Sequence, residues 1–121
     1  MTGEGYAIGQ AVAADNLRLG MSVIADSVNP WALTRDDWRA VAERAGVRSV
    51  EVEVVCSDVD LHQRRVESRS PDIPGHRLPA WKEVVDRDYQ PWNRERIVID
   101  TVSLNLQQCV DALISAISPQ T

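Results

Sequence analysis

Residues 48–69, RSVEVEVVCSDVDLHQRRVESR, place an expected strand directly before an expected helix. Valines alternate with glutamates over residues 48–56, and this period of two predicts a strand whose glutamate face is open to water. Ser57 and Asp60 are residue types that begin helices, so a capped helix is expected to follow. A strand that leads straight into a helix is typical of α/β proteins.

The chain before this stretch repeats the alternation. Residues 4–19 show helical spacing of apolar side chains and stop at a glycine, which is a common C-terminal cap. Residues 21–25, MSVIA, form a short apolar run that predicts a buried strand. Thr34 and Asp37 make a capping-box pattern, which predicts a helix that ends at Gly46.

The chain after this stretch adds three further elements. A proline-rich loop over residues 70–79 separates the helix that begins near Ser57 from an expected helix over residues 80–89. A third strand is expected over residues 97–100 and an amphipathic helix over residues 106–117. Five helices that alternate with three strands predict a parallel sheet with right-handed crossovers. Three strands are few for so much helix, so we expect the chain to begin in the middle of a fold.

The composition excludes several classes of protein. Thirteen Lys and Arg face eighteen Asp and Glu, a formal net charge of −5, so the basic surface typical of nucleic-acid and anionic-membrane binders is missing. Apolar residues make up 44%, as in a soluble globular domain. No apolar run approaches the roughly 20 residues of a membrane helix, and no targeting segment opens the sequence. We therefore expect one cytoplasmic domain over residues 1–121.

The cysteines and histidines follow no recognisable disulfide or metal pattern. Cys56 and Cys109 lie far apart in apolar surroundings, and His62 and His76 lack the spacing of metal ligands. We expect two buried and inert thiols and no zinc site.

A first candidate site follows the expected strand over residues 21–25. Ligands of open α/β sheets bind beyond the carboxyl ends of the strands, where this chain has Asp26, Ser27 and Asn29. An aspartate there can hold a magnesium ion through water, and an asparagine or serine can orient a phosphate or a hydroxyl. The alternative is that these residues merely cap a turn before Pro30.

A second candidate site lies on the helix after the central strand. Arg65 and Arg69 are four residues apart and project from one helix face, where a phosphate between them would relieve their repulsion. The alternative is a solvated surface, which we favour for Arg64 because Asp60 precedes it by one helical turn. The loop over residues 70–79 fits a lid or a stiff connector.

Three motifs follow one another along the chain: ADSVN at residues 25–29, VCSD at residues 55–58 and RVESR at residues 65–69. In order and spacing they resemble the later two-thirds of bacterial P-loop kinase-like ATPases, near zeta toxin, chloramphenicol phosphotransferase and polynucleotide kinase. The resemblance covers nearly the whole chain. It implies a P-loop NTPase-like three-layer fold, lid helices and the proline-rich loop over residues 57–92, and phosphoryl transfer from ATP to a hydroxyl.

The resemblance also implies roles for single residues. Asp26 matches the acidic residue that supports Mg²⁺, and Asn29 matches a polar position on the substrate side. Arg65 and Arg69 match the lid arginines that hold the phosphates of ATP, and all three charged residues thereby count as catalytic candidates. The loop after Asp100 matches the region beside the adenine.

The phosphoacceptor is not indicated by any motif. Arg87 and Trp92 would border the substrate pocket in this arrangement, together with the proline-rich loop. None of these residues selects among a sugar, an antibiotic and a nucleotide. ATP and Mg²⁺ are implied as cofactors by the resemblance alone.

The sequence departs from this family at the phosphate loop. No G-x-x-x-x-G-K-[ST] motif occurs, and the single lysine is Lys82. We therefore expect a domain truncated before its P-loop, which binds ATP weakly and is inactive alone. The absent first strand would lie between the strands that end at Asp26 and Cys56, so these two must pair directly or a homodimer or domain swap must fill the gap.

Two other hypotheses stay open. In the first, the chain is a non-catalytic, homodimeric interaction protein whose kinase-like motifs are inherited from an ancestor. It can also be one subunit of a split enzyme whose phosphate loop comes from another polypeptide.

Overall fold

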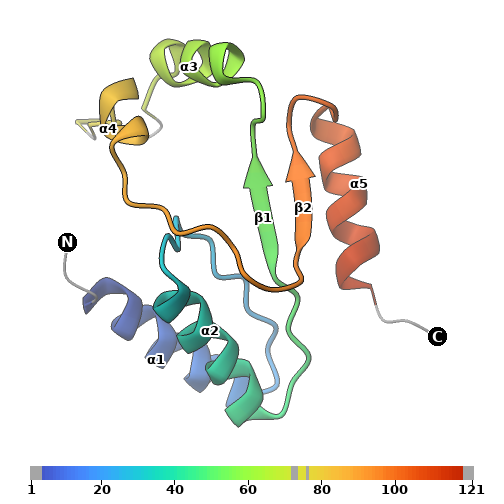
Figure 1. Ribbon diagram of the computed structural model, residues 1–121. Coiled ribbons are helices and arrows are strands. Elements are labelled where there is room, and N and C mark those ends of the chain that lie inside the picture. Colours follow the sequence, from blue (N-terminus) through green and yellow to red (C-terminus); the bar gives the residue numbers. More distant parts are fainter. Residues whose placement is uncertain (1–3, 72–73, 76, 119–121) are drawn as a thin grey trace. The chain divides into compact units, whose positions relative to one another are not determined.

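A computed structural model describes residues 4–71, 74–75 and 77–118 (Figure 1). The described residues fall into two compact units, a helical unit within residues 1–49 and 88–95 and a sheet unit within residues 50–87 and 96–121. The expectation that residues 1–121 form a single domain therefore stays a prediction. The elements in chain order are α1 (Glu4–Arg18), α2 (Ala32–Ala45), β1 (Val52–Val55), α3 (Val59–Ser68), α4 (Trp81–Val85), β2 (Ile97–Asp100) and α5 (Leu106–Ile117).

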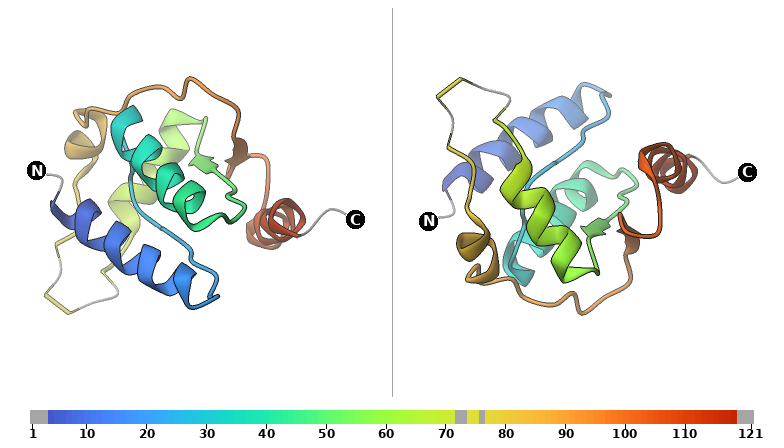
Figure 2. Two further views of the ribbon diagram at one scale, coloured as in Figure 1. Left: turned by 90° about the horizontal axis from the view of Figure 1, so that it is seen from below. Right: turned by 90° about the horizontal axis from the view of Figure 1, so that it is seen from above.

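The helical unit is built on the packing of α1 against α2, which lie side by side in Figures 1 and 2. Ala13, Val41 and Pro30 are buried apolar residues of this unit. The helices approach closely at Gly9, where an added Cβ would lie 3.3 Å from the ring of Trp38. An alanine at this position would therefore require the Trp38 ring to shift by a few tenths of an ångström.

Helix α2 ends where the sequence predicts, at Gly46, but it begins earlier than predicted. Gly46 has a φ of 70°, its N–H bonds to the Glu43 carbonyl, and the Val47 N–H bonds to the Ala42 carbonyl, as in a Schellman motif. The predicted start at Thr34 is wrong because the helix begins at Ala32. The Thr34 hydroxyl donates to the carbonyl of Trp31 (2.9 Å) instead of capping the helix.

The strand predicted over residues 21–25 is not formed, so the described sheet has two strands and not three. The Met21 N–H bonds back to the Asn16 carbonyl (3.1 Å), and Ile24 is 90% exposed. A strand needs a neighbour that takes up its N–H and C=O groups, and the described chain pairs β1 with β2 instead.

The sheet unit confirms the parallel α/β arrangement in a small form. β1 and β2 are parallel, with Val52 opposite Ile97, and α5 packs against β2 (Figure 1). Ile99 of β2 is the most buried side chain, at 2% exposure. The prediction that the glutamate face of β1 is open to water is wrong. Glu53 is ion-paired with Arg96 at 3.0 Å, and its side chain is 11% exposed.

The helices of the sheet unit differ from the prediction at their ends. Asp58, and not Ser57, caps α3, because its carboxylate accepts the Leu61 N–H (3.1 Å). α4 is shorter than expected. The α5 helix opens with a reciprocal cap between Asn105 and Gln108, each side chain accepting the other residue's backbone N–H at 2.8–2.9 Å.

The proline-rich segment after α3 is irregular wherever it is described. Residues 70–71, 74–75 and 77–79 form no helix or strand, and the rest of the loop, His76 included, lies outside the described residues. The His62 and Trp81 rings meet edge to face at 4.9 Å, which joins α3 to α4. Within the described ranges, no helix has the length and apolar character needed to cross a membrane.

Candidate functional site

The carboxyl ends of β1 and β2 lie at the same edge of the sheet, because the strands are parallel and the last residue of β1 is level with Asp100. Cys56 and Ser57 follow β1, and Thr101 follows β2. Arg65 reaches the same edge from α3. We call these five residues the strand-end cluster.

Arg65 joins the ends of both strands through one guanidinium group. Its Nη1 donates to Thr101 Oγ1 (2.7 Å) and lies 3.7 Å from Cys56 Sγ, and its Nη2 donates to the Thr101 carbonyl (3.3 Å). Thr101 in turn donates its backbone N–H to the Val55 carbonyl (2.9 Å). The side chain of Arg65 is thereby held at the edge of the sheet even though the residue is exposed.

Asp100 is the acidic member of the strand-end cluster. Its carboxylate accepts the backbone N–H groups of Ser57 (3.3 Å) and Val102 (3.0 Å). A hydrogen bond from the Ser57 hydroxyl, these backbone bonds and the charge of Arg65 lower the pKa of the Asp100 carboxyl. The carboxylate is therefore ionised throughout the neutral range.

This edge offers a cation and a hydrogen-bond acceptor to a ligand. A guanidinium has five N–H donors, and the contacts of Arg65 with Thr101 and Cys56 use three of them. A carboxylate such as that of Asp100 has about four acceptor positions, so it can bind a ligand hydroxyl besides its two backbone partners. A shallow, open hollow of about 590 Å³ lies next to Arg65 on α3. Its lining residues are Leu61, Arg64, Arg65, Glu67 and Ser68.

Arg65 and Asp100 lie at the same edge of the sheet, whereas Arg69 and Arg87 lie elsewhere. The Nη2 of Arg69 donates to the Pro79 carbonyl (3.4 Å), at the far end of the proline-rich loop. Arg87 is exposed in the turn after α4. Arg65 and Arg69, which the resemblance pairs as lid arginines, therefore have different partners in this conformation.

Asp26 and Asn29 belong to the helical unit. Asn29 has a φ of 50°, in the left-handed region that asparagine tolerates. Its N–H donates to the Tyr6 hydroxyl (3.0 Å), and its Oδ1 is buried with no hydrogen-bond partner among the described residues. Asp26 is exposed in the irregular segment before it.

A magnesium ion at the predicted position would find one carboxylate, that of Asp26. Mg²⁺ in phosphotransferases commonly takes one or two carboxylates, with water and substrate phosphates as its other ligands. Asp26 is an exposed carboxylate that can serve as one such ligand. Across the described ranges no three His, Cys, Asp or Glu side chains gather into a ready-made metal site.

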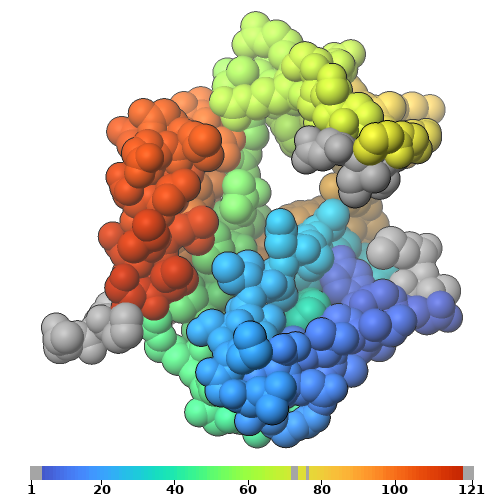
Figure 3. Space-filling model, turned by 180° about the vertical axis from the view of Figure 1, so that it is seen from behind, coloured from blue at the N-terminus to red at the C-terminus, as the bar shows by residue number. Residues whose placement is uncertain are grey.

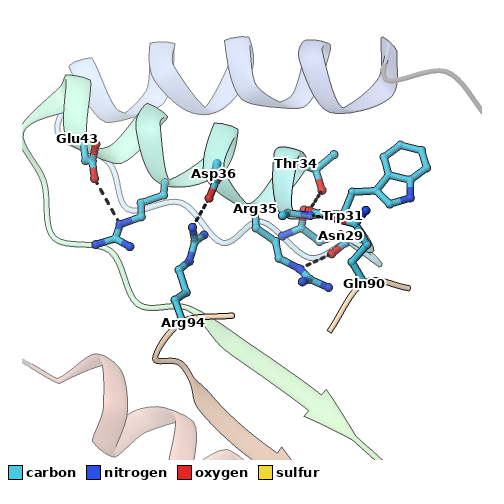
Figure 4. Close-up of polar contacts among 10 residues, drawn as sticks. Asn29, Trp31, Thr34, Arg35, Asp36, Glu43, Gln90 and Arg94 are labelled. Carbon is cyan, nitrogen blue, oxygen red and sulfur yellow. Dashed lines mark hydrogen bonds and ion pairs between the residues drawn. The ribbon is translucent and has the colours of Figure 1, made fainter. Parts of the chain in front are cut away.

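A buried arginine in the helical unit was missed by sequence reasoning. Arg35 is 3% exposed, and its guanidinium lies over the rings of Tyr89 (4.9 Å) and Trp92 (4.4 Å). Its Nε donates to the Asn29 carbonyl (3.0 Å) and its Nη2 to the Pro30 carbonyl (3.3 Å; Figure 4). No local motif marks this residue, because its aromatic partners follow more than fifty positions later.

The contacts of Arg35 are part of a set that fastens residues 88–95 to the rest of the helical unit. The Gln90 N–H donates to the Pro30 carbonyl (2.7 Å), and the Ala32 N–H donates to Gln90 Oε1 (2.8 Å). Arg94 is ion-paired with Asp36 (Figure 4). These bonds position the loop around Asn29.

The two cysteines are free thiols and are partly exposed, so the expectation of fully buried thiols is wrong. Cys56 belongs to the strand-end cluster. The Cys109 Sγ lies 3.8 Å from the Leu104 carbonyl at the start of α5.

Comparisons with family models, with curated proteins and with solved structures found no match to this chain. An assignment of function therefore depends on the three sequence motifs and on the geometry of the strand-end cluster.

Proposed function

We propose that this chain carries the lid and the nucleotide-side edge of a kinase-like, ATP-dependent phosphotransferase. The observation that carries the proposal is the position of Arg65, held across the ends of two parallel strands beside the ionised Asp100. Ligands of parallel α/β sheets bind at this edge. The order of ADSVN, VCSD and RVESR along the chain supports the same reading.

The chemistry of the two residues fits the two ends of ATP. Arg65 keeps a planar positive charge at every physiological pH and can donate its remaining N–H groups to phosphate oxygens. Asp100 can accept a hydrogen bond from a ribose hydroxyl or from the amino group of the base. Within the described residues Arg69 makes one long hydrogen bond, of 3.4 Å to the Pro79 carbonyl, so exchanging that carbonyl for a phosphate costs little.

The proposed site is completed by a phosphate loop from outside these 121 residues. Such a loop supplies backbone N–H groups and a lysine to the β- and γ-phosphates and a hydroxyl to Mg²⁺. Mg²⁺, when bound, would neutralise charge on the transferring phosphoryl group. The roles of Asp26 as a metal ligand and of Asn29 on the acceptor side are proposed from the sequence resemblance alone. Without the loop, the chain binds ATP weakly and transfers no phosphate.

The proposal is tested by titrating the chain with MgATP and with tripolyphosphate in a calorimeter. Arg65→Gln and Arg18→Gln each remove one helix cation, but Arg18 lies on α1 in an exposed ion pair with Asp15 and outside the strand-end cluster. We expect Arg65→Gln to weaken ATP binding at least tenfold, the loss that follows from one charge-assisted phosphate contact of about 1.4 kcal/mol or more, and Arg18→Gln to change it less than twofold.

The same titration can contradict the proposal in two ways. Either the wild-type chain shows no saturable binding at millimolar ATP, or the two variants lose affinity equally. Far-ultraviolet circular dichroism identifies a variant that has unfolded, and in that case Arg69→Gln is the replacement, because its hydrogen bond joins no strand ends.

The source of the phosphate loop is a separate question. Reading the native DNA in frame ahead of Met1 tests whether G-x-x-x-x-G-K-[ST] is encoded there. A phosphate loop in frame supports one kinase-like polypeptide. A stop codon favours the split enzyme or the interaction protein.

A further inference from the structure

The side chain of Thr101 has two polar neighbours that fix the direction of its hydroxyl group. Its Oγ1 lies 3.2 Å from the Val55 carbonyl and 2.7 Å from Nη1 of Arg65. A carbonyl can only accept a hydrogen bond, so the single hydroxyl proton points to Val55 and the lone pairs of Oγ1 face the guanidinium. The hydroxyl therefore connects Arg65 to the last carbonyl of β1.

Thr101 binds Arg65 a second time through its backbone. The Thr101 carbonyl accepts a hydrogen bond from Nη2 of Arg65 (3.3 Å), so both terminal nitrogens of the guanidinium share one partner residue. Thr101 is itself fixed, because its N–H donates to the Val55 carbonyl (2.9 Å). Figure 3 shows the residues after β2 (orange) next to the start of α3 (yellow-green). Two bonds to one anchored residue leave the guanidinium little freedom to rotate.

These contacts also decide which N–H groups of Arg65 stay available. A guanidinium has one N–H on Nε and two on each terminal nitrogen. Thr101 takes the end pair, which is one N–H from each terminal nitrogen, and the other N–H of Nη1 lies on the side of Cys56 Sγ, 3.7 Å away. Within the described ranges, no bond of Arg65 uses its Nε. The side pair that remains, the Nε–H and the second N–H of Nη2, consists of two parallel donors.

We infer that Thr101 is a positioning residue that holds Arg65 by its end pair and leaves the side pair for two oxygens of one phosphate group. The phosphate half of this inference rests on the proposed function. Two parallel guanidinium donors match a phosphate in a bidentate geometry, which fixes the orientation of the bound group. Because Arg65 is already ordered, little side-chain entropy is lost when the phosphate binds.

The positioning of Arg65 is tested by NMR relaxation of its Nε–H group, whose signal is identified by its loss in Arg65→Gln. Thr101→Val keeps the shape of the side chain but removes the hydroxyl, and Thr101→Ser keeps the hydroxyl. We expect the heteronuclear NOE of Arg65 to fall in Thr101→Val to the value of Arg64, an exposed arginine of the same helix, and to keep its wild-type value in Thr101→Ser. Ser103→Ala is the matched control, because it removes a hydroxyl of the same loop whose partner is the Asp100 carbonyl (3.3 Å).

The phosphate half is tested by adding tripolyphosphate to the same samples. In the wild-type chain we expect the Arg65 Nε–H resonance to shift on binding, because Nε belongs to the side pair. We expect Thr101→Val to weaken tripolyphosphate binding about fivefold, the effect of one lost hydrogen bond, and Thr101→Ser and Ser103→Ala to stay within about twofold of wild type. Recovery in Thr101→Ser separates the hydroxyl from a general effect of substitution at this position.

Two results would overturn the inference. One is an Arg65 NOE that Thr101→Val leaves unchanged, which means that other contacts order the guanidinium. The other is tripolyphosphate binding without a shift of the Arg65 Nε–H, which means that the phosphate uses another face or another residue. A wild-type chain that binds no tripolyphosphate overturns the proposed function and the phosphate half together, whereas the NOE comparison decides the role of Thr101 by itself. Thr101→Ala serves in both measurements if Thr101→Val fails to fold.

Discussion

Arg35 keeps a positive charge at 3% exposure, which is unfavourable unless other groups replace its water shell. Two backbone carbonyls and two aromatic rings do so here, and all four come from the loop around Asn29 and from residues 88–95. A guanidinium can donate in its plane and stack over rings at the same time, whereas a lysine ammonium cannot. The residue thus joins two segments that are remote in sequence.

Replacing Arg35 with lysine tests this role while the charge is kept. Arg35→Lys loses the stacking on Trp92 and at least one carbonyl bond, so we expect the free energy of unfolding to fall by about 1–3 kcal/mol. Urea unfolding followed by tryptophan fluorescence measures the change. Arg39→Lys, at a 48% exposed ion pair with Glu43, is the control and is expected to stay within about 0.5 kcal/mol of wild type. An equal effect of both changes would mean that the burial of Arg35 is unimportant.

Asp100 makes stability depend on pH in a definite direction. Its pKa is lowered in the folded chain, first by the hydrogen bond from the Ser57 hydroxyl and then by the backbone bond from Val102. A group with a lowered folded pKa contributes stability that is present above its unfolded pKa of about 3.9 and is lost as the pH falls through its folded pKa. We therefore expect Asp100→Asn to flatten the loss of thermal stability below about pH 4.

The control for this pH series is Asp111→Asn on α5. Asp111 accepts a hydrogen bond from Gln107 Nε2 (2.9 Å) within its own helix and has no part in the strand-end cluster. Melting temperatures measured from pH 7 down to about pH 3 should fall for Asp111→Asn as they do for wild type. A wild-type slope retained in Asp100→Asn would show that other carboxylates dominate the acid limb.

At the scale of the elements, the periodicity of the sequence predicts those helices and strands that form through local contacts. The parallel pair of strands and α5 follow from alternating and helical apolar patterns, and Gly46 ends α2 where the sequence places it. The cap of α3 is predicted one position early, because Ser57 and Asp58 compete for the same role. The cap of α2 is predicted three positions late, because the helix starts after Trp31, whose side chain makes no capping bond. Residues 21–25 have the composition of a strand, but a strand also needs a neighbour.

Contacts between remote segments explain what sequence reasoning missed. Arg65 was predicted as a phosphate ligand from its helix face, yet its bonds to Thr101 cross 36 positions. Ser57 was predicted only as a helix start and as part of VCSD, and Thr101 not at all, because a serine and a threonine after strands are common and have no spacing that marks a site. Asp100 was included through the resemblance, and the structure gives it a place beside Arg65.

At the scale of the whole molecule, the net charge of the chain bears on whether the proposed phosphotransferase acts on a nucleic acid or on a small molecule. A nucleic-acid acceptor is held through its phosphates by Lys and Arg, and such contacts dominate its affinity. This chain has one lysine and a net charge of −5. For the proposed phosphotransferase we therefore expect a small-molecule acceptor and not a nucleic acid.

This preference predicts that the chain does not retain nucleic acid. A fluorescent single-stranded DNA of about 20 nucleotides should show no rise in anisotropy with up to about 50 μM protein at about 150 mM salt, because too few cations are available to release counterions from the strand. Repeating the titration at about 20 mM salt separates weak electrostatic contacts, which strengthen as salt falls, from base stacking, which changes less. A dissociation constant below about 10 μM at the higher salt would contradict the prediction, since it lies within the range of ordinary non-specific nucleic-acid binders. Such binding would show that the net charge of −5 does not exclude nucleic acid as the phosphoacceptor.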